Sequence, residues 1–169
     1  SKWVSKNNST NLLIFIHGTG AHKKWWDPIA PQFLNESNVI AVDLPGMGDS
    51  DFRDTYSITD FGKCIFSIID KEKIEMNIEN IYIVGHSLGG QVAAYVASEN
   101  KNLVTSLIMI DTFIRPPDYD PSQHEGGPLR KIKHYPEKIT ILERFRLMPE
   151  QTCHNTWFLR YIAEYSVKE

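Results

Sequence analysis

A short segment near the middle of the chain sets the strongest limits on the fold. The apolar run at residues 81–84 is followed by Gly85-His86-Ser87-Leu88-Gly89 and then by a helical run at residues 90–97. A strand that turns sharply into a helix at a serine exposes that hydroxyl above the sheet. The flanking glycines leave room where a Cβ would collide with the neighbouring strand or helix. The segment therefore predicts a strand–turn–helix unit with Ser87 as a candidate nucleophile.

Three further apolar runs, at residues 12–16, 39–42 and 107–110, indicate more β-strands. Their apolarity is continuous rather than alternating, which predicts strands buried on both faces. Helical patterns lie between them, one at residues 26–34 and one at residues 61–69, the latter preceded by a capping box from Ser57 to Asp60. This alternation predicts a parallel sheet with crossover helices.

Several polar residues fall just past predicted strand ends: His17-Gly18, Asp43, Ser87 and Asp111. In parallel sheets with crossover helices, ligands bind at the carboxyl ends of the strands. We therefore expect these residues to gather at one edge of the sheet and to form the site.

The composition changes after residue 110. Residues 115–121 are rich in proline, and two amphipathic helices are predicted beyond them, at residues 137–148 and 155–165. In the first, Ile139, Leu142 and Phe145 are expected to face a core. In the second, Trp157, Tyr161 and Tyr165 form one stripe. We predict a core domain over residues 1–114 and a helical lid over residues 115–169.

Composition and charge exclude several classes of protein. Hydrophobic residues make up 41% of the chain and charged residues 23%, which is ordinary for a globular domain. The net charge of -3 gives no electrostatic case for nucleic acid or an anionic membrane. No apolar run is long enough to span a bilayer. Two cysteines make no disulfide framework, so we expect a reducing, cytoplasmic location. No metal-ligand spacing and no phosphate-binding glycine loop is present.

Three ordered motifs carry a resemblance to a known family. They are His17-Gly18, Asp43-Leu44-Pro45-Gly46-Met47-Gly48-Asp49-Ser50 and Gly85-His86-Ser87-Leu88-Gly89-Gly90. Together they resemble the α/β-hydrolase fold superfamily, in its lid-bearing esterase, lipase and haloperoxidase-like branch. The resemblance implies an α/β fold with a mostly parallel sheet, helices on both faces and the start of a helical lid. It also implies a fragment that lacks the C-terminal strands.

The resemblance assigns roles to individual residues. Ser87 is the expected nucleophile, and the backbone N–H groups of Leu88 and Thr19 are the expected oxyanion hole, with Gly20 as a second choice for the latter. Gly18 and Trp157 are expected to line the substrate pocket. His17 and His86 are expected to be structural, and neither a cofactor nor a metal is implied.

The acid and the base of the triad are left open by the sequence. In a minority of relatives the acid follows the strand after the elbow helix, the position of Asp111 here; otherwise both acid and histidine are expected beyond Glu169. The other histidines that follow Ser87 are His124, His134 and His154, all in the lid-like region.

The resemblance implies a serine hydrolase that acts on an ester or similar carbonyl through an acyl-enzyme at Ser87. The expected partner is a small apolar substrate. The alternatives are a C–C bond hydrolase or perhydrolase with the same serine, or a non-catalytic ligand-binding homologue. Dehalogenases and epoxide hydrolases of this fold carry an aspartate at the position of Ser87, which argues against both.

Overall fold

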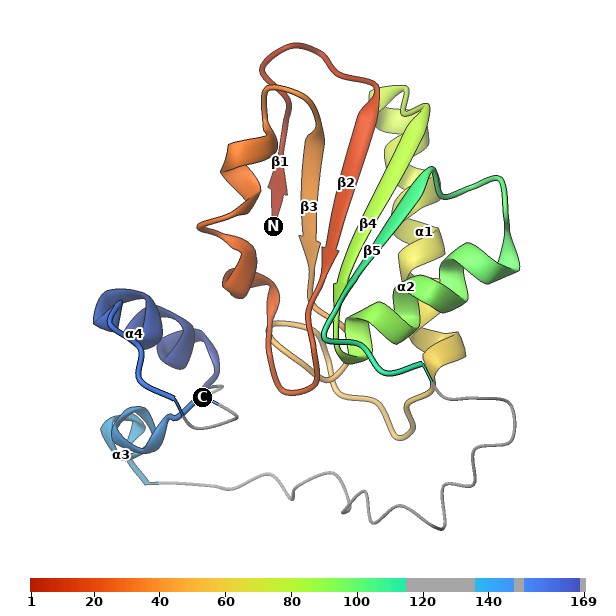
Figure 1. Cartoon of the computed structure of the whole chain (residues 1–169). Coiled ribbons are helices and arrows are strands. Elements are labelled where there is room, and N and C mark those ends of the chain that lie inside the picture. The colour runs from red at the N-terminus through yellow and green to blue at the C-terminus, as the bar shows by residue number, and fades with distance from the viewer. Residues whose placement is uncertain (115–135, 148–150, 168–169) are drawn as a thin grey trace. The chain divides into compact units, whose positions relative to one another are not determined.

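The computed structural model describes residues 1–114, 136–147 and 151–167, which cluster into two units, Ser1–Phe113 and Ile114–Glu169. The first unit contains a five-stranded sheet in the order β1-β3-β2-β4-β5 (Figure 1). The strands are β1 (Lys2–Trp3), β2 (Asn11–Ile16), β3 (Asn38–Val42), β4 (Asn80–His86) and β5 (Ser106–Ile110). All neighbouring pairs are parallel except β1 with β3. The predicted parallel sheet is confirmed, and the carboxyl ends of its parallel strands share one edge.

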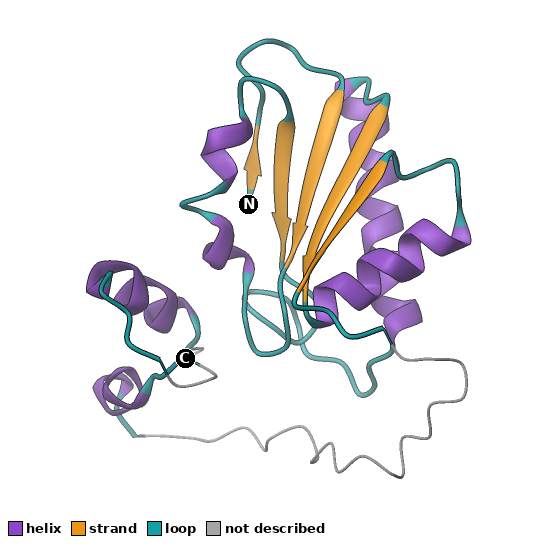
Figure 2. Ribbon diagram, in the orientation of Figure 1, coloured by secondary structure: helices purple, strands orange, loops and turns teal. Residues whose placement is uncertain are grey.

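Helices cover both faces of this sheet, as predicted (Figure 2). The helices α1 (Ile58–Met76) and α2 (Leu88–Glu99) pack on one face, and the 3-10 helices η1 (Lys23–Trp26) and η2 (Ala30–Phe33) lie on the other. Alternate residues of β2 divide between the two cores. Leu12, Ile14 and Ile16 face α1 and α2, whereas Leu13 and Phe15 contact Trp26 and Ala30. Both faces of β2 are therefore buried, which is why its sequence is continuously apolar.

The long helix α1 begins at the predicted cap. The Ser57 hydroxyl accepts a hydrogen bond from the Asp60 N–H at 3.1 Å and donates one to the Asp60 carboxylate at 2.6 Å. The helix ends at Asn77, whose φ of 50° is the left-handed conformation common after a helix. Between these ends, Phe61, Ile65 and Ile69 are buried in the core.

Two details of the first unit differ from the prediction. The single helix expected over residues 26–34 is instead η1 and η2, because Pro28 and Pro31 remove N–H donors that an α-helix would need. The two-residue strand β1 was not predicted, since a strand of that length leaves no periodic pattern.

The prediction that β5 is buried on both faces is wrong. Ile108 is 56% exposed, and Met109 and Ile110 are also exposed. The physical reason is position, since β5 is the edge strand of the described sheet and pairs with β4 alone among the described strands. Continuous apolarity therefore identified β5 as a strand, but it did not predict how much of β5 the other described residues bury.

The second unit contains two described helices, α3 (Lys138–Arg144) and α4 (Thr156–Tyr165). Asn155 caps α4 by accepting the Phe158 N–H at 3.0 Å. The predicted aromatic stripe is present, because Tyr161 stacks on Trp157 and meets Tyr165 edge to face. Ile139 was expected to face a core, but it is 51% exposed, and α3 has no buried residue among those described. No helix among the described residues has the length and apolarity needed to cross a membrane.

We predict that Ile69→Ala lowers the free energy of unfolding by about 2–5 kcal/mol. Ile69 is fully buried in the core, so the substitution removes apolar contacts and leaves a cavity. Urea unfolding measures the change. Ile74→Ala in the same helix is the matched control, because Ile74 is 85% exposed, and it should change the stability by less than about 0.5 kcal/mol. Equal losses in both variants would contradict this assignment of the core.

Candidate active site

Ser87 lies in the turn between β4 and α2, in a conformation that side chains rarely adopt. Its φ and ψ are 50° and −116°. The turn is closed by its own backbone, since the Gly90 and Gln91 N–H groups donate to the Ser87 carbonyl at 3.0 and 3.2 Å. A strained residue of this kind persists only where its surroundings hold it, and such residues cluster at functional sites. The local geometry is the sharp strand–turn–helix junction at Ser87 that the sequence predicts.

The two glycines of the elbow have no room for a side chain. A Cβ on Gly85 would collide with the backbone of Gly89, at the start of α2. A Cβ on Gly89 would meet the carbonyl oxygens of Ile16 and His17, at the end of β2. The expected role of both glycines is therefore confirmed, and the N-terminus of α2 reaches the carboxyl end of the sheet.

The loop after β2 lies against this turn. A Cβ on Gly18 would come within 2.8 Å of His86 Nδ1 and 3.2 Å of Ser87 Cβ. The loop turns at Gly20, whose φ is +72°, and the Ala21 N–H donates to the Gly18 carbonyl at 3.2 Å. The Gly20 N–H points to the Met47 thioether, with 3.4 Å between N and Sδ. The Thr19 N–H, in contrast, is accepted by no described residue.

His17 is buried and both of its ring nitrogens are used. Nδ1 donates to the Gly18 carbonyl at 2.8 Å, since a carbonyl only accepts, and Nε2 accepts the Leu44 N–H at 3.1 Å. Burial lowers the pKa of His17 below its ordinary value, which favours the neutral ring that this pattern requires. His17 therefore joins the loops after β2 and β3, and it has no nitrogen left to take a proton from Ser87.

The Asp43 carboxylate organises the loop after β3. It accepts the Lys23 N–H at 2.7 Å, the Lys23 ammonium at 2.7 Å and the Asp49 N–H at 3.0 Å. Lys23 also reaches the Asp49 carboxylate at 2.6 Å. Burial alone would raise the pKa of Asp43, but these hydrogen bonds outweigh it, and the pKa lies below its ordinary value. For Lys23 the signs are reversed: burial alone would lower the pKa, but the two carboxylate partners hold it above its ordinary value.

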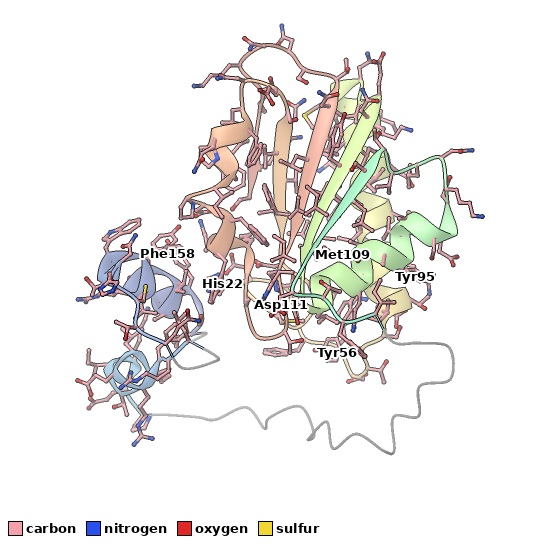
Figure 3. The ribbon with its side chains drawn as sticks, in the orientation of Figure 1. His22, Tyr56, Tyr95, Met109, Asp111 and Phe158 are labelled. Atoms are coloured by element: carbon pink, nitrogen blue, oxygen red, sulfur yellow. The ribbon has the colours of Figure 1, made fainter. Side chains whose placement is uncertain are left out.

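Asp111 lies just past β5, at the same end of the sheet (Figure 3). Its φ is +45°, so its backbone is strained as that of Ser87 is. The residue before it accepts the Ser87 N–H, at 3.0 Å from the Ile110 carbonyl. The loop that carries Asp111 is therefore attached directly to the elbow, and its side chain is exposed.

Other residues proposed from the sequence lie apart from this geometry. Trp157 is on α4 in the second unit and is 68% exposed, and His154 is exposed in the same unit. His124 and His134 lie outside the described residues. Within the described ranges, no histidine is hydrogen-bonded to the Ser87 hydroxyl, and no three His, Cys, Asp or Glu side chains gather as a metal site would need.

Sequence reasoning did not single out three residues that shape the site: Lys23, Thr112 and Gln91. Lys23 binds the Asp43 carboxylate, the Thr112 hydroxyl contacts the Ser87 carbonyl, and the Gln91 side chain donates to the Phe113 carbonyl. Each acts through a side-chain contact to a residue at least 20 positions away, which leaves no local pattern.

Comparison with known proteins gives consistent results. A family model described as alpha/beta hydrolase fold matches residues 11–139. A pimeloyl-[acyl-carrier protein] methyl ester esterase from Pseudoalteromonas atlantica is 33% identical over 102 residues, covering 59% of this chain and 36% of that protein. A soluble epoxide hydrolase from Corynebacterium sp. is 31% identical over 100 residues, covering 59% and 34%. The chain thus spans about a third of the length of these two relatives.

Among solved structures, the thioesterase domain from the curacin biosynthetic pathway matches 97% of this chain and 61% of its own chain. The TM-score is 0.72 and the sequence identity 21%, so this similarity shows the fold alone.

We predict that Asp43→Asn lowers the free energy of unfolding at pH 7 by about 1–3 kcal/mol, because it weakens charge-assisted hydrogen bonds. The folded pKa of Asp43 lies below its unfolded value of about 3.9, so this stabilisation is present above pH 4 and is lost as the pH falls through the folded pKa. Urea unfolding of both proteins between pH 7 and pH 2.5 measures it.

The control is Asp49→Asn, because the Asp49 side chain is 75% exposed and its pair with Lys23 should contribute less than about 1 kcal/mol. A difference between the wild type and Asp43→Asn that stayed constant with pH would contradict the role given to the carboxylate.

Proposed function

The chain belongs to the alpha/beta hydrolase fold family, and on this basis we propose that the protein is a serine hydrolase of carboxylic esters. The observation that carries the proposal is the conformation of Ser87. A non-glycine residue with a φ of 50° stands between two glycines that admit no Cβ, at the junction of a strand and a helix. Such a turn presents the hydroxyl at the carboxyl end of the sheet, where a substrate carbonyl can reach it.

In the proposed reaction, Ser87 Oγ attacks the ester carbonyl while its proton passes to an imidazole base. The carbonyl π electrons move onto oxygen, and the N–H groups of Thr19 and Leu88 bind the resulting oxyanion. The base returns its proton to the alkoxide as the ester C–O bond breaks, which leaves an acyl-serine. Water then attacks the acyl carbon in the same way, and the acid product and free Ser87 are released.

Two features of the loop after β2 support Thr19 as an oxyanion donor. The contact of Gly18 with His86 and Ser87 brings this loop against the elbow. The Gly20 N–H is directed to the Met47 sulfur, whereas the Thr19 N–H is accepted by no described residue. Leu88 is the first residue of α2, so its N–H has no acceptor within the helix and is available to a substrate.

We propose Asp111 as the acid that orients the base. An orienting carboxylate must be held near the nucleophile, and the carbonyl of the preceding residue already accepts the Ser87 N–H. The base itself is an imidazole that the described residues do not bring to Ser87. His17 is unsuited to the role, because both of its nitrogens are engaged.

The proposed substrate class is an ester with an apolar acyl or alcohol group. The aromatic stripe of α4 supports it, because Trp157 and Phe158 both stack on Tyr161 and Trp157 is 68% exposed, which gives the second unit an apolar surface of the kind that binds such groups. The matched esterase from P. atlantica is, by its name, an enzyme for a methyl ester.

The first test is reaction of the whole protein with a fluorophosphonate probe, followed by peptide mass spectrometry. We expect one adduct, on Ser87, and none in Ser87→Ala, which should remain folded by circular dichroism. A folded wild type that gives no adduct would contradict the proposal and favour a ligand-binding homologue. If the adduct forms, turnover of p-nitrophenyl esters against vinylogous diketones separates an esterase from a C–C bond hydrolase.

A second prediction concerns the strain at Asp111. Asp111→Gly should lower the rate of ester hydrolysis at least about a hundredfold, because it removes the carboxylate. The free energy of unfolding should not fall, since glycine adopts a φ of +45° without the penalty that a Cβ brings.

Asn77→Gly is the matched control, because Asn77 has a φ of 50° at the end of α1, away from the site. It should leave both activity and stability nearly unchanged. Full activity in Asp111→Gly would contradict the assignment of Asp111 as the acid.

A further inference from the structure

The loop after β5 is attached to the elbow by three hydrogen-bonded contacts. The Ser87 N–H donates to the Ile110 carbonyl at 3.0 Å. The Thr112 hydroxyl lies 3.3 Å from the Ser87 carbonyl and 3.0 Å from the Ile110 carbonyl, so its one proton is shared between an acceptor in the elbow and one at the end of β5. The Gln91 side-chain amide donates to the Phe113 carbonyl at 2.9 Å. Asp111 lies within this bonded segment, between Ile110 and Thr112.

Close packing adds to these bonds. A Cβ on Gly90 would collide with the Thr112 hydroxyl and lie 2.8 Å from Thr112 Cβ and Cγ2. Thr112 therefore sits directly on the first turn of α2, where only glycine leaves space for it. The loop is held by shape as well as by hydrogen bonds.

Gln91 is hydrogen-bonded to both the elbow and the loop after β5. Its backbone N–H donates to the Ser87 carbonyl at 3.2 Å, and its side chain donates to Phe113. One residue in the first turn of α2 thus fixes the elbow and the loop that carries Asp111. The strained backbone of Asp111 needs such support, because a φ of +45° persists only where neighbouring contacts impose it.

We propose that Gln91 and Thr112 are positioning residues, which hold Asp111 at a fixed place relative to Ser87. This inference rests on the proposed function, in which Asp111 orients the base. Neither residue touches the reacting atoms. Their effect on the reaction passes through Asp111, and this distinguishes them from residues that merely stabilise α2.

The experiment is a double-mutant cycle with Gln91→Met and Asp111→Asn, read out as the rate of ester hydrolysis against pH. Methionine keeps the length of glutamine and removes the donor. Gln91→Met should lower kcat between about twofold and tenfold, the factor that corresponds to one neutral hydrogen bond. In the Asp111→Asn background it should have no further effect, because residues that act through one another are not additive.

The pH profile gives a second readout. A carboxylate beside the imidazole favours its protonated form, so a displaced Asp111 lowers the apparent pKa of the base. The acidic limb of the profile should therefore move to lower pH in Gln91→Met, in the same direction as in Asp111→Asn. Thr112→Val should act like Gln91→Met, and Thr112→Ser, which keeps the hydroxyl, should restore most of the rate.

The matched control is Gln32→Met. Gln32 also donates its side-chain amide to a backbone carbonyl at 3.0 Å, that of Pro28, but it does so on η2. It should leave kcat and the pH profile unchanged. Amide exchange of Ser87 adds a measurement without substrate, because loosening of the loop should speed exchange of the N–H that donates to Ile110.

The outcomes separate this inference from the proposed function. Loss of activity in Asp111→Asn with an additive effect of Gln91→Met, or with unchanged Ser87 exchange, would overturn the positioning role alone. Full activity in Asp111→Asn would overturn the acid assignment and the positioning role with it. An inactive wild type that gives no fluorophosphonate adduct would overturn the proposed function, and the positioning role would fall together with it.

Discussion

The arrangement of the site depends on how closely the start of α2 approaches the end of β2. Gly89 lies so near the carbonyl oxygens of Ile16 and His17 that no Cβ fits between them. Because of this approach, the first N–H groups of α2 and the loop after β2 reach the same edge of the sheet. This close packing places the first turn of α2 beside the loop after β2. A larger residue at position 89 would push the start of α2 away from the end of β2.

The buried polar side chains beside this junction serve the backbone. The two ring nitrogens of His17 are hydrogen-bonded to the Gly18 carbonyl and the Leu44 N–H. Asp43 accepts two N–H groups and one ammonium in addition to lying 3.9 Å from His17 Nε2. Buried polar groups with complete partners are rigid, so the loop after β2 has a defined shape before any ligand arrives. The position of His17 just past a strand end could suggest a catalytic base. Its hydrogen bonds instead show that it holds the loops after β2 and β3 together.

The sequence predicted those parts of the fold that repeat along the chain. Continuous apolar runs identified β2 to β5, and the spacing of apolar residues and the Ser57 cap identified α1. Pro28 and Pro31 interrupt the helix expected over residues 26–34, because each lacks the N–H that an α-helix needs even where the apolar spacing is helical. The edge position of β5 agrees with the expectation that C-terminal strands are lacking. The contacts of Gln91 were beyond prediction, because they depend on which distant segment becomes its neighbour and nothing near it in the sequence encodes that.

Strain links the two residues that the proposed chemistry needs. Four described non-glycine residues have a positive φ, and two of them are asparagines, the residue type that tolerates this conformation best apart from glycine. The other two are Asp111, whose residue type also tolerates this conformation better than most, and Ser87, whose residue type does not. Each follows a parallel strand at the same edge of the sheet, and the Ser87 N–H donates to the residue before Asp111. One backbone hydrogen bond therefore connects the two strained segments directly. Glycine would adopt the φ of either position without the penalty that a Cβ brings. A hydroxyl and a carboxylate stand there instead, and these are the two groups that the proposed chemistry uses.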